Sequence, residues 1–424
     1  MSDIGPGPGE ILFLAHRVPF PPDRGDKIRS HHLLRHLATL APVHVACFGE
    51  TADDMAQDGA LAAVAASHCL VQRRVPVPLA ALQAVASGKP ISLTAFASPR
   101  IRRYVDHVLA TRPIAAIVVF SGQMAQFLPM CRGSHQNSSF GGRIVMDFVD
   151  VDSAKFEAYA ATKPQPLSAL YRREARLLRR FEADVAARVD CSLLATHEEA
   201  ALFTSRLTRA PGDGAVCALQ NGTDTVFFDP AGIRREPALM HGGPHIVFTG
   251  QMDYPPNIEA VRHFAHTVMP AIRAKLAHAL FDVVGRAPTS AVRMLDGMNG
   301  TRVHGAVPDV RPWLAGADLV VAPLLIARGV QNKVLEAMAM ARPVLTTSAA
   351  ATGIGAREGT DMMVADGSDA LAAAALELLC DPAAALALGQ AGRKFVVNSR
   401  CWERALAPLG GLVLGDHLDH RDAA

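Results

Sequence analysis

The hydrophobic pattern of this chain repeats one arrangement twice, in which a short apolar strand is followed by a longer stretch with helical spacing. In the first half, the predicted strands are residues 11–15, 43–48, 115–120, 144–148 and 192–195. In the second half, they are residues 246–249, 281–284, 302–304, 319–322 and 344–347. Alternating strands and helices are typical of parallel sheets with crossover helices. The pattern therefore predicts an α/β protein with two Rossmann-like, doubly wound domains that face a cleft.

The length and one irregular segment predict the domain boundaries. A chain of 424 residues is too long for one ordinary hydrophobic core. Residues 225–243 are rich in Pro and Gly and lack periodicity, so we interpret them as a linker between residues 1–224 and residues 244–398. We expect residues 399–424 to form a helix that returns to the first domain, followed by a tail. In doubly wound sheets, ligands bind at the carboxyl ends of the strands.

Composition and charge narrow the class of protein. Half of the residues are apolar, which is typical of a globular protein. The net charge is only +2, so the chain lacks the excess of positive charge that is typical of nucleic-acid-binding proteins. The first residues lack the pattern of a secretory signal, and the apolar run ILFLA is too short to span a bilayer. We therefore expect a cytoplasmic protein, with peripheral contact at the inner membrane face left open. Seven cysteines without a CxxC pair favour buried free thiols over disulfides or a zinc site.

The most informative segment is DLVVAPLLIARGVQNKVLEAMAMARPVLTTS. It predicts a strand, a loop over residues 323–330, a helix over about residues 331–340, and a second strand after Pro343. An amphipathic helix between buried strands, without a ligand, fits the pattern. A ligand site at the start of the helix fits it as well.

The start of this predicted helix is a candidate phosphate site. Free amides at the start of a helix bind anions, and a diphosphate suits a helix start that follows the flexible Gly329. Lys333 and Arg328 add positive charge, and the Glu336 carboxylate can accept ribose hydroxyls. The other residues at this helix entrance are Val330, Gln331 and Asn332.

The run EAMAMARPVL resembles the signature of the retaining glycosyltransferases of family 4, which share the two-lobed GT-B fold. The resemblance places Glu336 in the ribose-binding position, and Arg328 where the family has its first glutamate. LQNGTDTVFF resembles the turn that precedes the family's second domain. VHGAVPDVRPWLAGADLVVAPL resembles its base-binding loop, where backbone groups at Ala306 and Val307 would face the base.

The segment TGQMDYPPNIEAVRHF resembles the opening of the family's second domain, where many members carry an Arg and a Lys for the diphosphate. Both are absent here. After Gly250, the side chains of Gln251 and Asn257 are candidates for neutral hydrogen bonds to the donor. Arg286 in DVVGRAP is a candidate for the missing charge, and a surface position for Arg286 fits equally well.

In the first domain, AHRVPFPPDRGDKIRS places Gly25 and a Pro-rich loop between the first strand and a helix, at a place open to phosphate. This segment and MDFVDVDS resemble those of a narrower subgroup, the sugar transferases associated with PEP-CTERM/exosortase and exopolysaccharide systems. MDFVDVDS carries three carboxylates, Asp147, Asp150 and Asp152, at the end of a strand. We assign the catalytic role to Asp150 or Asp152, together with Lys333 and Arg328. Asp152 can equally cap a helix, and a metal site is disfavoured.

Residues 166–190 form a predicted basic helix with Leu170, Leu177 and Phe181 near one face. Such a helix can lie on anionic lipid, which suits a lipid-linked acceptor. Interleaved arginines and glutamates are also typical of a solvated face, and both interpretations stay open.

The combined prediction is a metal-independent, cofactor-free hexosyltransferase of the retaining type. It would transfer a sugar from a nucleoside diphosphate sugar to a glycan or lipid-linked acceptor in exopolysaccharide or cell-surface polysaccharide synthesis. Its partners would be the donor and the acceptor, without nucleic acid, and peripheral contact with a membrane surface stays open. Two alternatives remain, a nucleotide-sugar epimerase of the same fold and a catalytically silent nucleotide-binding partner protein. A nicotinamide dehydrogenase is disfavoured because ILFLAHRVPFPPDRG lacks the GxGxxG turn.

Overall fold

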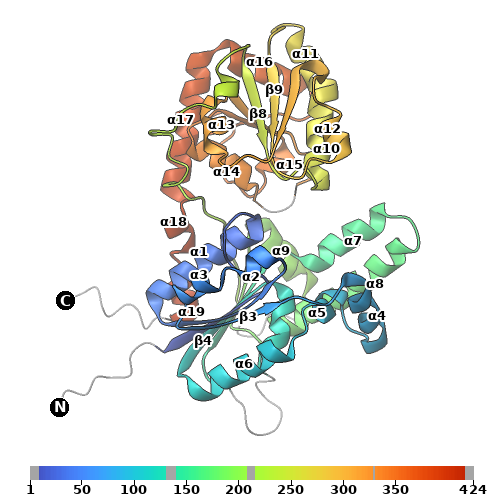
Figure 1. Ribbon diagram of the computed structural model, residues 1–424, viewed down its shortest axis with the longest axis vertical. Coiled ribbons are helices and arrows are strands. Elements are labelled where there is room, and N and C mark those ends of the chain that lie inside the picture. Colours follow the sequence, from blue (N-terminus) through green and yellow to red (C-terminus); the bar gives the residue numbers. More distant parts are fainter. Residues whose placement is uncertain (1–8, 130–139, 208–214, 328–329, 416–424) are drawn as a thin grey trace, which may run out of the picture. The chain divides into compact units, whose positions relative to one another are not determined.

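The computed structural model describes residues 9–129, 140–207, 215–327 and 330–415. The chain divides into two compact units, one of residues 1–220 and 406–424, the other of residues 221–405. Each unit is a parallel sheet with helices on both faces (Figure 1). The α/β fold class with two Rossmann-like domains is therefore confirmed.

In its described residues, the first unit has a seven-stranded sheet in the order β3-β2-β1-β4-β5-β6-β7. The strands are β1 (Glu10–Ala15), β2 (Val43–Gly49), β3 (Ser67–Gln72), β4 (Ile114–Phe120), β5 (Arg143–Val149), β6 (Cys191–Leu194) and β7 (Ala215–Ala218). Ile11 of β1 pairs with Val43 on one side and with Ala116 on the other. Because the order reverses between β1 and β4, their carboxyl ends form the switch point where doubly wound sheets bind ligands.

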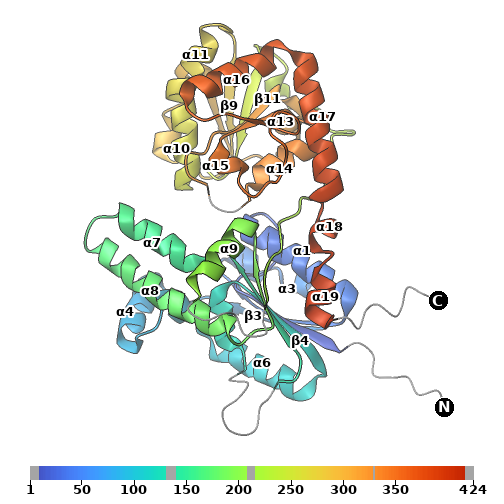
Figure 2. The ribbon, with the colours of Figure 1, turned by 180° about the vertical axis from the view of Figure 1, so that it is seen from behind.

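The helices of the first unit cover both faces of this sheet (Figure 2). They are α1 (Gly25–Leu40), α2 (Ala52–Met55), α3 (Asp58–Ala62), α4 (Val77–Ser87), α5 (Ile91–Ala95), α6 (Pro99–Thr111), the 3-10 helix η1 (Gly122–Phe127), α7 (Asp152–Thr162), α8 (Leu167–Ala186), α9 (His197–Arg206) and α19 (Leu409–Leu414). The last helix, α19, comes from the carboxyl end of the chain and packs on β4 and β5. There, Arg143 Nε donates a hydrogen bond to the Leu412 carbonyl at 3.1 Å.

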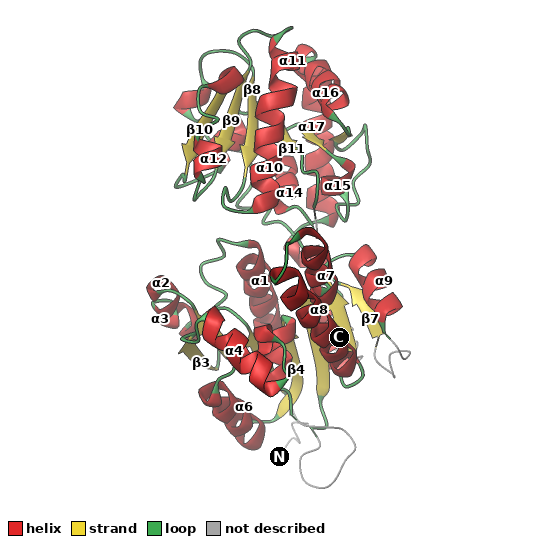
Figure 3. Ribbon diagram, turned by 90° about the vertical axis from the view of Figure 1, so that its right-hand side faces the viewer, coloured by secondary structure: helices red, strands yellow, loops and turns green. Residues whose placement is uncertain are grey.

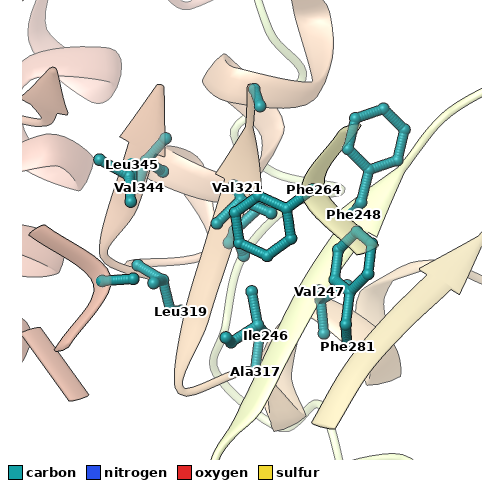
Figure 4. Close-up of a cluster of buried hydrophobic side chains, with 14 of the residues drawn as sticks. Ile246, Val247, Phe248, Phe264, Phe281, Ala317, Leu319, Val321, Val344 and Leu345 are labelled. Atoms are coloured by element: carbon teal, nitrogen blue, oxygen red, sulfur yellow. The ribbon is translucent and has the colours of Figure 1, made fainter. Parts of the chain in front are cut away.

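The second unit repeats the architecture with a six-stranded sheet among its described residues, in the order β10-β9-β8-β11-β12-β13. The strands are β8 (His245–Thr249), β9 (Leu280–Val284), β10 (Thr301–Gly305), β11 (Leu319–Ala322), β12 (Val344–Thr346) and β13 (Met363–Val364). Its switch point lies between β8 and β11. Phe248, Phe264 and Phe281 pack with the aliphatic side chains of these strands in its core (Figure 4), and the rings of Phe264 and Phe281 lie 4.7 Å apart.

The helices of the second unit flank that sheet (Figure 3). They are η2 (Pro237–Leu239), α10 (Pro255–His263), the π-helix η3 (Phe264–Val268), α11 (Met269–Arg273), α12 (Ser290–Arg293), η4 (Met298–Gly300), α13 (Arg311–Gly316), α14 (Asn332–Ala339), α15 (Ser348–Ala351), α16 (Ser368–Cys380) and α17 (Pro382–Ser399). The short helix α18 (Trp402–Leu406) includes the division between the units, which lies between residues 405 and 406. Among the described residues, no single helix is long and apolar enough to cross a membrane. Helices α16 and α17 meet that test only when they are taken together, as a pair bent by 102°.

The segment 225–243, predicted as a linker, belongs to the second unit. Its side chains contact that unit: the Arg311 guanidinium lies 3.9 Å from the ring centre of Phe227, and Leu239 is part of the core. Arg393 donates to the Phe228 carbonyl at 3.2 Å and to Asp229 at 2.9 Å. The units instead divide at residues 220 and 221, upstream of the predicted boundary.

The ten predicted strands are all present, and β3, β7 and β13 were missed. All three lie at sheet edges. Strands β7 and β13 are only 4 and 2 residues long, and β3 mixes polar with apolar residues, so the period that marks a buried strand is weak in them. Four of the six described cysteines are buried free thiols, as expected. The expectation is wrong for Cys217, which is half-buried, and for Cys380, which is exposed on α16; Cys131 lies outside the described residues.

Candidate functional site

Three glycines end the three neighbouring strands β8, β9 and β10 of the second unit. Gly250, Gly285 and Gly305 have φ values of 157°, 158° and 71°, which favour glycine. The Gly250 amide donates to the Val284 carbonyl at 3.0 Å, and the Gly285 amide donates to the Gly305 carbonyl at 2.8 Å. A Cβ on Gly285 would lie 1.6 Å from the Gly250 oxygen. At the ends of these three strands, the main chain is therefore closely packed and carries no side chain at the glycine positions, which allows a ligand to approach the backbone.

Lys333 reaches this glycine edge from the first turn of α14. Its Nζ donates to Asn257 Oδ1 at 2.6 Å and lies 4.4 Å from the ring centre of Phe248. Asn257 is buried in α10, and its Nδ2 donates to the Gln251 carbonyl at 2.8 Å. A Cβ on Gly250 would be 3.1 Å from the lysine Nζ. The structure thus brings four of the predicted donor residues together, with one cation beside the turn that follows β8.

The side chain of Gln251 holds Arg286. With its amide oriented so that Oε1 faces the guanidinium, Gln251 accepts from Arg286 Nε at 3.1 Å and from Nη2 at 2.5 Å. The Arg286 carbonyl also accepts from the Met252 amide at 2.9 Å. Arg286 is half-buried at this turn, so its guanidinium has a defined position. Gln251 was expected to bind the donor directly, and its side-chain oxygen is instead engaged with a second cation.

Glu336 lies one helical turn after Lys333 on α14 and is half-buried. Among the described residues, its carboxylate has no hydrogen-bond partner. Desolvation raises the pKa of Glu336 to about 7, opposed by the attraction of Lys333. Desolvation likewise lowers the pKa of Lys333 to about 7, opposed by Glu336. Both oxygens of the Glu336 carboxylate can accept hydrogen bonds from hydroxyl groups. The charged forms of Glu336 and Lys333 stabilise each other by electrostatic attraction.

The helix entrance is described only in part. Gln331 is the N-cap residue of α14 and makes no side-chain capping hydrogen bond, and Val330 precedes it as a half-buried residue. Asn332 has a buried Oδ1 without a hydrogen-bond partner among the described residues. Arg328 and Gly329 lie outside the described residues.

The predicted base-binding loop follows Gly305 at the end of β10. Ala306 is exposed there, and Val307 is half-buried and packs against the core. Both residues directly follow Gly305, whose carbonyl accepts from the Gly285 amide.

The carboxyl edge of the first unit is built around a buried ion pair. Arg29 on α1 and Asp147 on β5 are 1% and 0% exposed, and Arg29 Nε donates to Asp147 Oδ2 at 2.8 Å. Asp147 Oδ1 accepts from the Val149 amide at 3.0 Å, and its carbonyl accepts from the Ser121 amide at 2.8 Å. Val149 and Ser121 have φ values of 71° and 76°, which strain residues other than glycine. The ion pair therefore holds a strained turn in which Asp150 follows Val149.

The structure separates the roles of the three predicted carboxylates. Asp147 is structural, as described above. Asp152 begins α7 and accepts from Lys155 Nζ at 2.7 Å. Asp150 is half-buried, and its carboxylate has no hydrogen-bond partner among the described residues. Desolvation, with a smaller contribution from Glu199, raises the pKa of Asp150 to about 6. Of the three, Asp150 is therefore the carboxylate that is available to a ligand.

The Pro-rich loop after β1 leads into a helix start that differs from the expected phosphate loop. Gly25 is exposed as the first residue of α1, but the nearby Lys27 is buried. Lys27 Nζ donates to Asp54 Oδ1 at 2.5 Å and to the Phe20 carbonyl at 3.3 Å. The ammonium group of Lys27 is thus engaged within the fold and does not face an anion at Gly25.

Sequence reasoning missed His16, which follows β1 at the switch point. Its ring is buried, stacks on Phe120 at 5.6 Å, and has Nε2 3.3 Å from Asp26 Oδ2. Desolvation lowers the pKa of His16, so the neutral ring is favoured. The position of a histidine directly after the first strand was a usable signal, since the carboxyl end of that strand borders the switch point.

The second unit matches a known family. Residues 243–381 match the family model described as glycosyl transferases group 1. The second unit thus carries a group 1 glycosyltransferase domain. This segment holds Gly250, Gln251, Asn257, Lys333 and Glu336. No curated protein matches the chain.

The whole chain is similar in fold to solved glycosyltransferases of the GT-B type. Sucrose-phosphate synthase from Thermosynechococcus elongatus is 16% identical, with a TM-score of 0.67 over 95% of this chain and 98% of that one. HepE from Anabaena, solved with UDP-glucose, is 12% identical, with a TM-score of 0.63 over 95% and 100%. WaaG, involved in lipopolysaccharide biosynthesis, is 15% identical, with a TM-score of 0.63 over 96% and 100%. The chain has the GT-B glycosyltransferase fold.

Proposed function

We propose that the chain is a retaining, metal-independent hexosyltransferase that uses a nucleoside diphosphate sugar. The acceptor is a glycan or a lipid-linked sugar in exopolysaccharide or cell-surface polysaccharide synthesis, as the resemblance to family 4 and its PEP-CTERM-associated subgroup implies. The observation that carries the proposal is the convergence of Lys333, Asn257 and Gln251 on the bare main chain at Gly250. A cation beside a side-chain-free turn suits a diphosphate.

The departing diphosphate would be stabilised by charge that is already in place. Lys333 is held by Asn257, and Arg286 is held by Gln251, so neither cation must be reoriented when the bond to the sugar breaks. The positive end of the α14 dipole, at Asn332, acts in the same direction. These groups replace the Arg and Lys that the family carries after its first strand of this domain. In this proposal they also supply the charge neutralisation that a metal ion supplies elsewhere.

The nucleoside would be held on the same edge. The Glu336 carboxylate, with no partner among the described residues, would accept the two ribose hydroxyls, and the main chain at Ala306 and Val307 would face the base. Because HepE was solved with UDP-glucose, UDP-sugars are the first donors to test.

Asp150 is the proposed reactive group of the first unit. With a pKa of about 6 and no hydrogen-bond partner among the described residues, it can accept a hydrogen bond or a proton from a sugar hydroxyl at neutral pH. The strained turn at Val149 keeps it at the carboxyl edge of β5.

The test uses two substitutions in the second unit and two matched controls. We expect Glu336→Ala to weaken nucleotide binding by about tenfold to a hundredfold, since charged hydrogen bonds contribute about 1.5–3 kcal/mol. We expect Lys333→Ala to lower kcat by about a hundredfold or more, as when one stabilising donor is lost. Binding is measured by titration with UDP-, GDP-, ADP- and TDP-sugars, and turnover by release of the nucleotide. Glu377→Ala on α16 and Lys394→Ala on α17 change exposed residues of the same unit and should have no effect.

Wild-type binding and turnover in both site variants would refute the assignment. Conversion of the donor to an epimer without any acceptor would show an epimerase instead. Nucleotide binding without turnover across a panel of glycan and lipid-linked acceptors would show a catalytically silent protein.

A further inference from the structure

Helix α4 of the first unit turns its large apolar side chains outward. Leu79, Leu82 and Val85 are 46%, 69% and 60% exposed, whereas the small Ala80 and Ala84 are fully buried. Residues three apart lie on the same side of a helix, so the three large side chains form one apolar face. Exposing large apolar residues together while burying alanines is the reverse of an ordinary surface helix. We call the face of Leu79, Leu82 and Val85 the α4 face.

The basic helix α8 lies beside α4 and is linked to it by hydrogen bonds. Arg173 Nη2 donates to the Ala84 carbonyl at 2.7 Å and to the Lys89 carbonyl at 3.3 Å, which joins α8 to the end of α4. Glu174 is buried and accepts from the amides of Ile91 and Ser92 at 2.9 and 3.2 Å, which fixes α5 as well. The two helices lie side by side in opposite views (Figures 1 and 2). Helices α4 and α8 are therefore joined by these hydrogen bonds, and both carry exposed side chains in this part of the first unit.

The charges next to the α4 face are mostly positive. Arg74 precedes α4 and Lys89 follows it, and both are exposed. Between α4, α5 and α8 lies a pocket lined by Leu93 and Leu177, with Lys89, Arg180 and the acid Asp184 also on its wall. A partner that fits this surface has an apolar layer to take up the leucines and a negatively charged surface beside it. The exposed arginines of α8 are Arg172, Arg176, Arg179 and Arg180.

We propose that the α4 face and the exposed arginines of α8 dock the protein on the surface of a bilayer that contains anionic lipid. An interfacial helix inserts its apolar side chains at the acyl boundary, while nearby cations gain about 1 kcal/mol each from anionic headgroups. The basic helix was expected to supply its own apolar contact, but Leu170, Leu177 and Phe181 are half-buried, and Phe181 packs against the core. Helix α4 supplies the apolar part instead. This inference rests on the proposed function only in that such docking brings the enzyme to a lipid-linked acceptor.

The experiment measures sedimentation of the full chain with vesicles of phosphatidylcholine, alone or mixed with phosphatidylglycerol. We expect binding to the mixed vesicles that weakens as salt is added. The double variant L82D and V85D should lose at least about tenfold in vesicle affinity, because two exposed apolar contacts become charged. The double variant R176E and R180E should lose binding to the mixed vesicles and its salt dependence.

Matched controls lie on α17 of the second unit. Leu386 is 55% exposed and Lys394 is exposed, so L386D and K394E make the same chemical changes away from the α4 face. These variants should bind vesicles like the wild type. All four proteins should unfold at the wild-type temperature, because every substituted side chain is solvent-accessible.

Three results would overturn the proposal. The first is that the wild type binds neither vesicle, and the second is that L82D/V85D binds vesicles as well as the wild type does. The third is that the wild type forms a dimer in size-exclusion chromatography and L82D/V85D does not, since the α4 face would then join two copies of the chain. Nucleotide titration without vesicles separates this proposal from the proposed function. Wild-type nucleotide affinity in L82D/V85D, with vesicle binding lost, supports the docking surface. Vesicle binding without any nucleotide binding would leave the docking surface intact and refute the proposed function alone.

Discussion

The two units have the same sheet topology around the switch point, but different types of residue lie at the carboxyl ends of their strands. In the second unit, Gly250, Gly285 and Gly305 leave the edge as bare main chain, and Lys333 and Arg286 stand beside it. In the first unit, non-glycine residues occupy the strained positions, and the buried pair of Arg29 and Asp147 holds them.

This difference follows from what each edge has to present. A diphosphate is recognised by main chain and cations, so side chains near the turn must be absent and positive charge must be present. A carboxylate such as Asp150 needs a rigid turn and few hydrogen-bond donors, so that its oxygens stay available and its pKa stays high. The same fold can therefore present a diphosphate site in one unit and a reactive carboxylate in the other, depending on which residues follow its strands.

The largest expected effect comes from breaking the ion pair of the first unit. Arg29→Met leaves the Asp147 carboxylate buried without its cation, and removing one partner of a buried pair costs about 3–5 kcal/mol. We expect the free energy of unfolding in urea to fall by that amount. Arg103→Met, on the exposed part of α6, is the control and should change it little. An Arg29→Met protein as stable as the wild type would show that the pair does not hold this edge.

A smaller loss is expected from the glycine edge of the second unit. Gly285→Ala would place a Cβ 1.6 Å from the Gly250 oxygen, so the two turns must separate. We expect a loss of about 2–4 kcal/mol in the free energy of unfolding and nucleotide binding too weak to titrate. Gly297→Ala also replaces a glycine of positive φ, 81° instead of 158°, but its Cβ would meet no other atom within 4 Å, so it tests the cost of a left-handed backbone without the clash. Equal losses in both variants would mean that close approach of the turns is unimportant.

The smallest expected effect is a gain in stability. Above pH 6, the folded protein carries an ionised Asp150 that is poorly solvated, and its raised pKa makes this form unfavourable. Asp150→Asn removes that cost, so at pH 7.5 we expect the variant to be more stable by about 1–2 kcal/mol after allowance for partial exposure. The gain should shrink as the pH falls from 6 toward 4, where the carboxyl group is protonated in the folded state and increasingly so in the unfolded state.

Turnover should change in the opposite direction. If Asp150 accepts a proton or a hydrogen bond from a sugar hydroxyl, Asp150→Asn lowers kcat by about a hundredfold or more. Asp152→Asn is the matched control, since Asp152 is engaged with Lys155. A destabilised Asp150→Asn protein, or one with wild-type turnover, would contradict the distinction between the two edges.

The periodicity of the hydrophobic residues was sufficient to predict much of the fold. The buried strands β1, β4, β8 and β11 are continuous apolar runs, and α14 follows its loop where the signature placed it. These features depend on local residue order, which a linear pattern records. The short edge strand β13 has no such pattern, because only pairing with β12 makes it a strand.

The signature segment likewise identified Lys333 and Glu336 as candidate site residues, but it did not predict which residues contact them. Asn257 precedes Lys333 by 76 positions, and Arg29 precedes Asp147 by 118 positions, so no spacing rule connects either pair. The same holds for Gln251, whose engagement with Arg286 depends on two turns at the ends of different strands.

The sequence alone was sufficient for the doubly wound architecture, the segment that carries the candidate donor site and the three candidate carboxylates. Folding was needed to distinguish Asp150 from Asp147 and to turn the leucines of α4 outward beside α8. The physical reason is that hydrophobic periodicity is a property of neighbouring residues. Burial, pKa and ion pairing depend on which distant segments the packed sheet brings into contact.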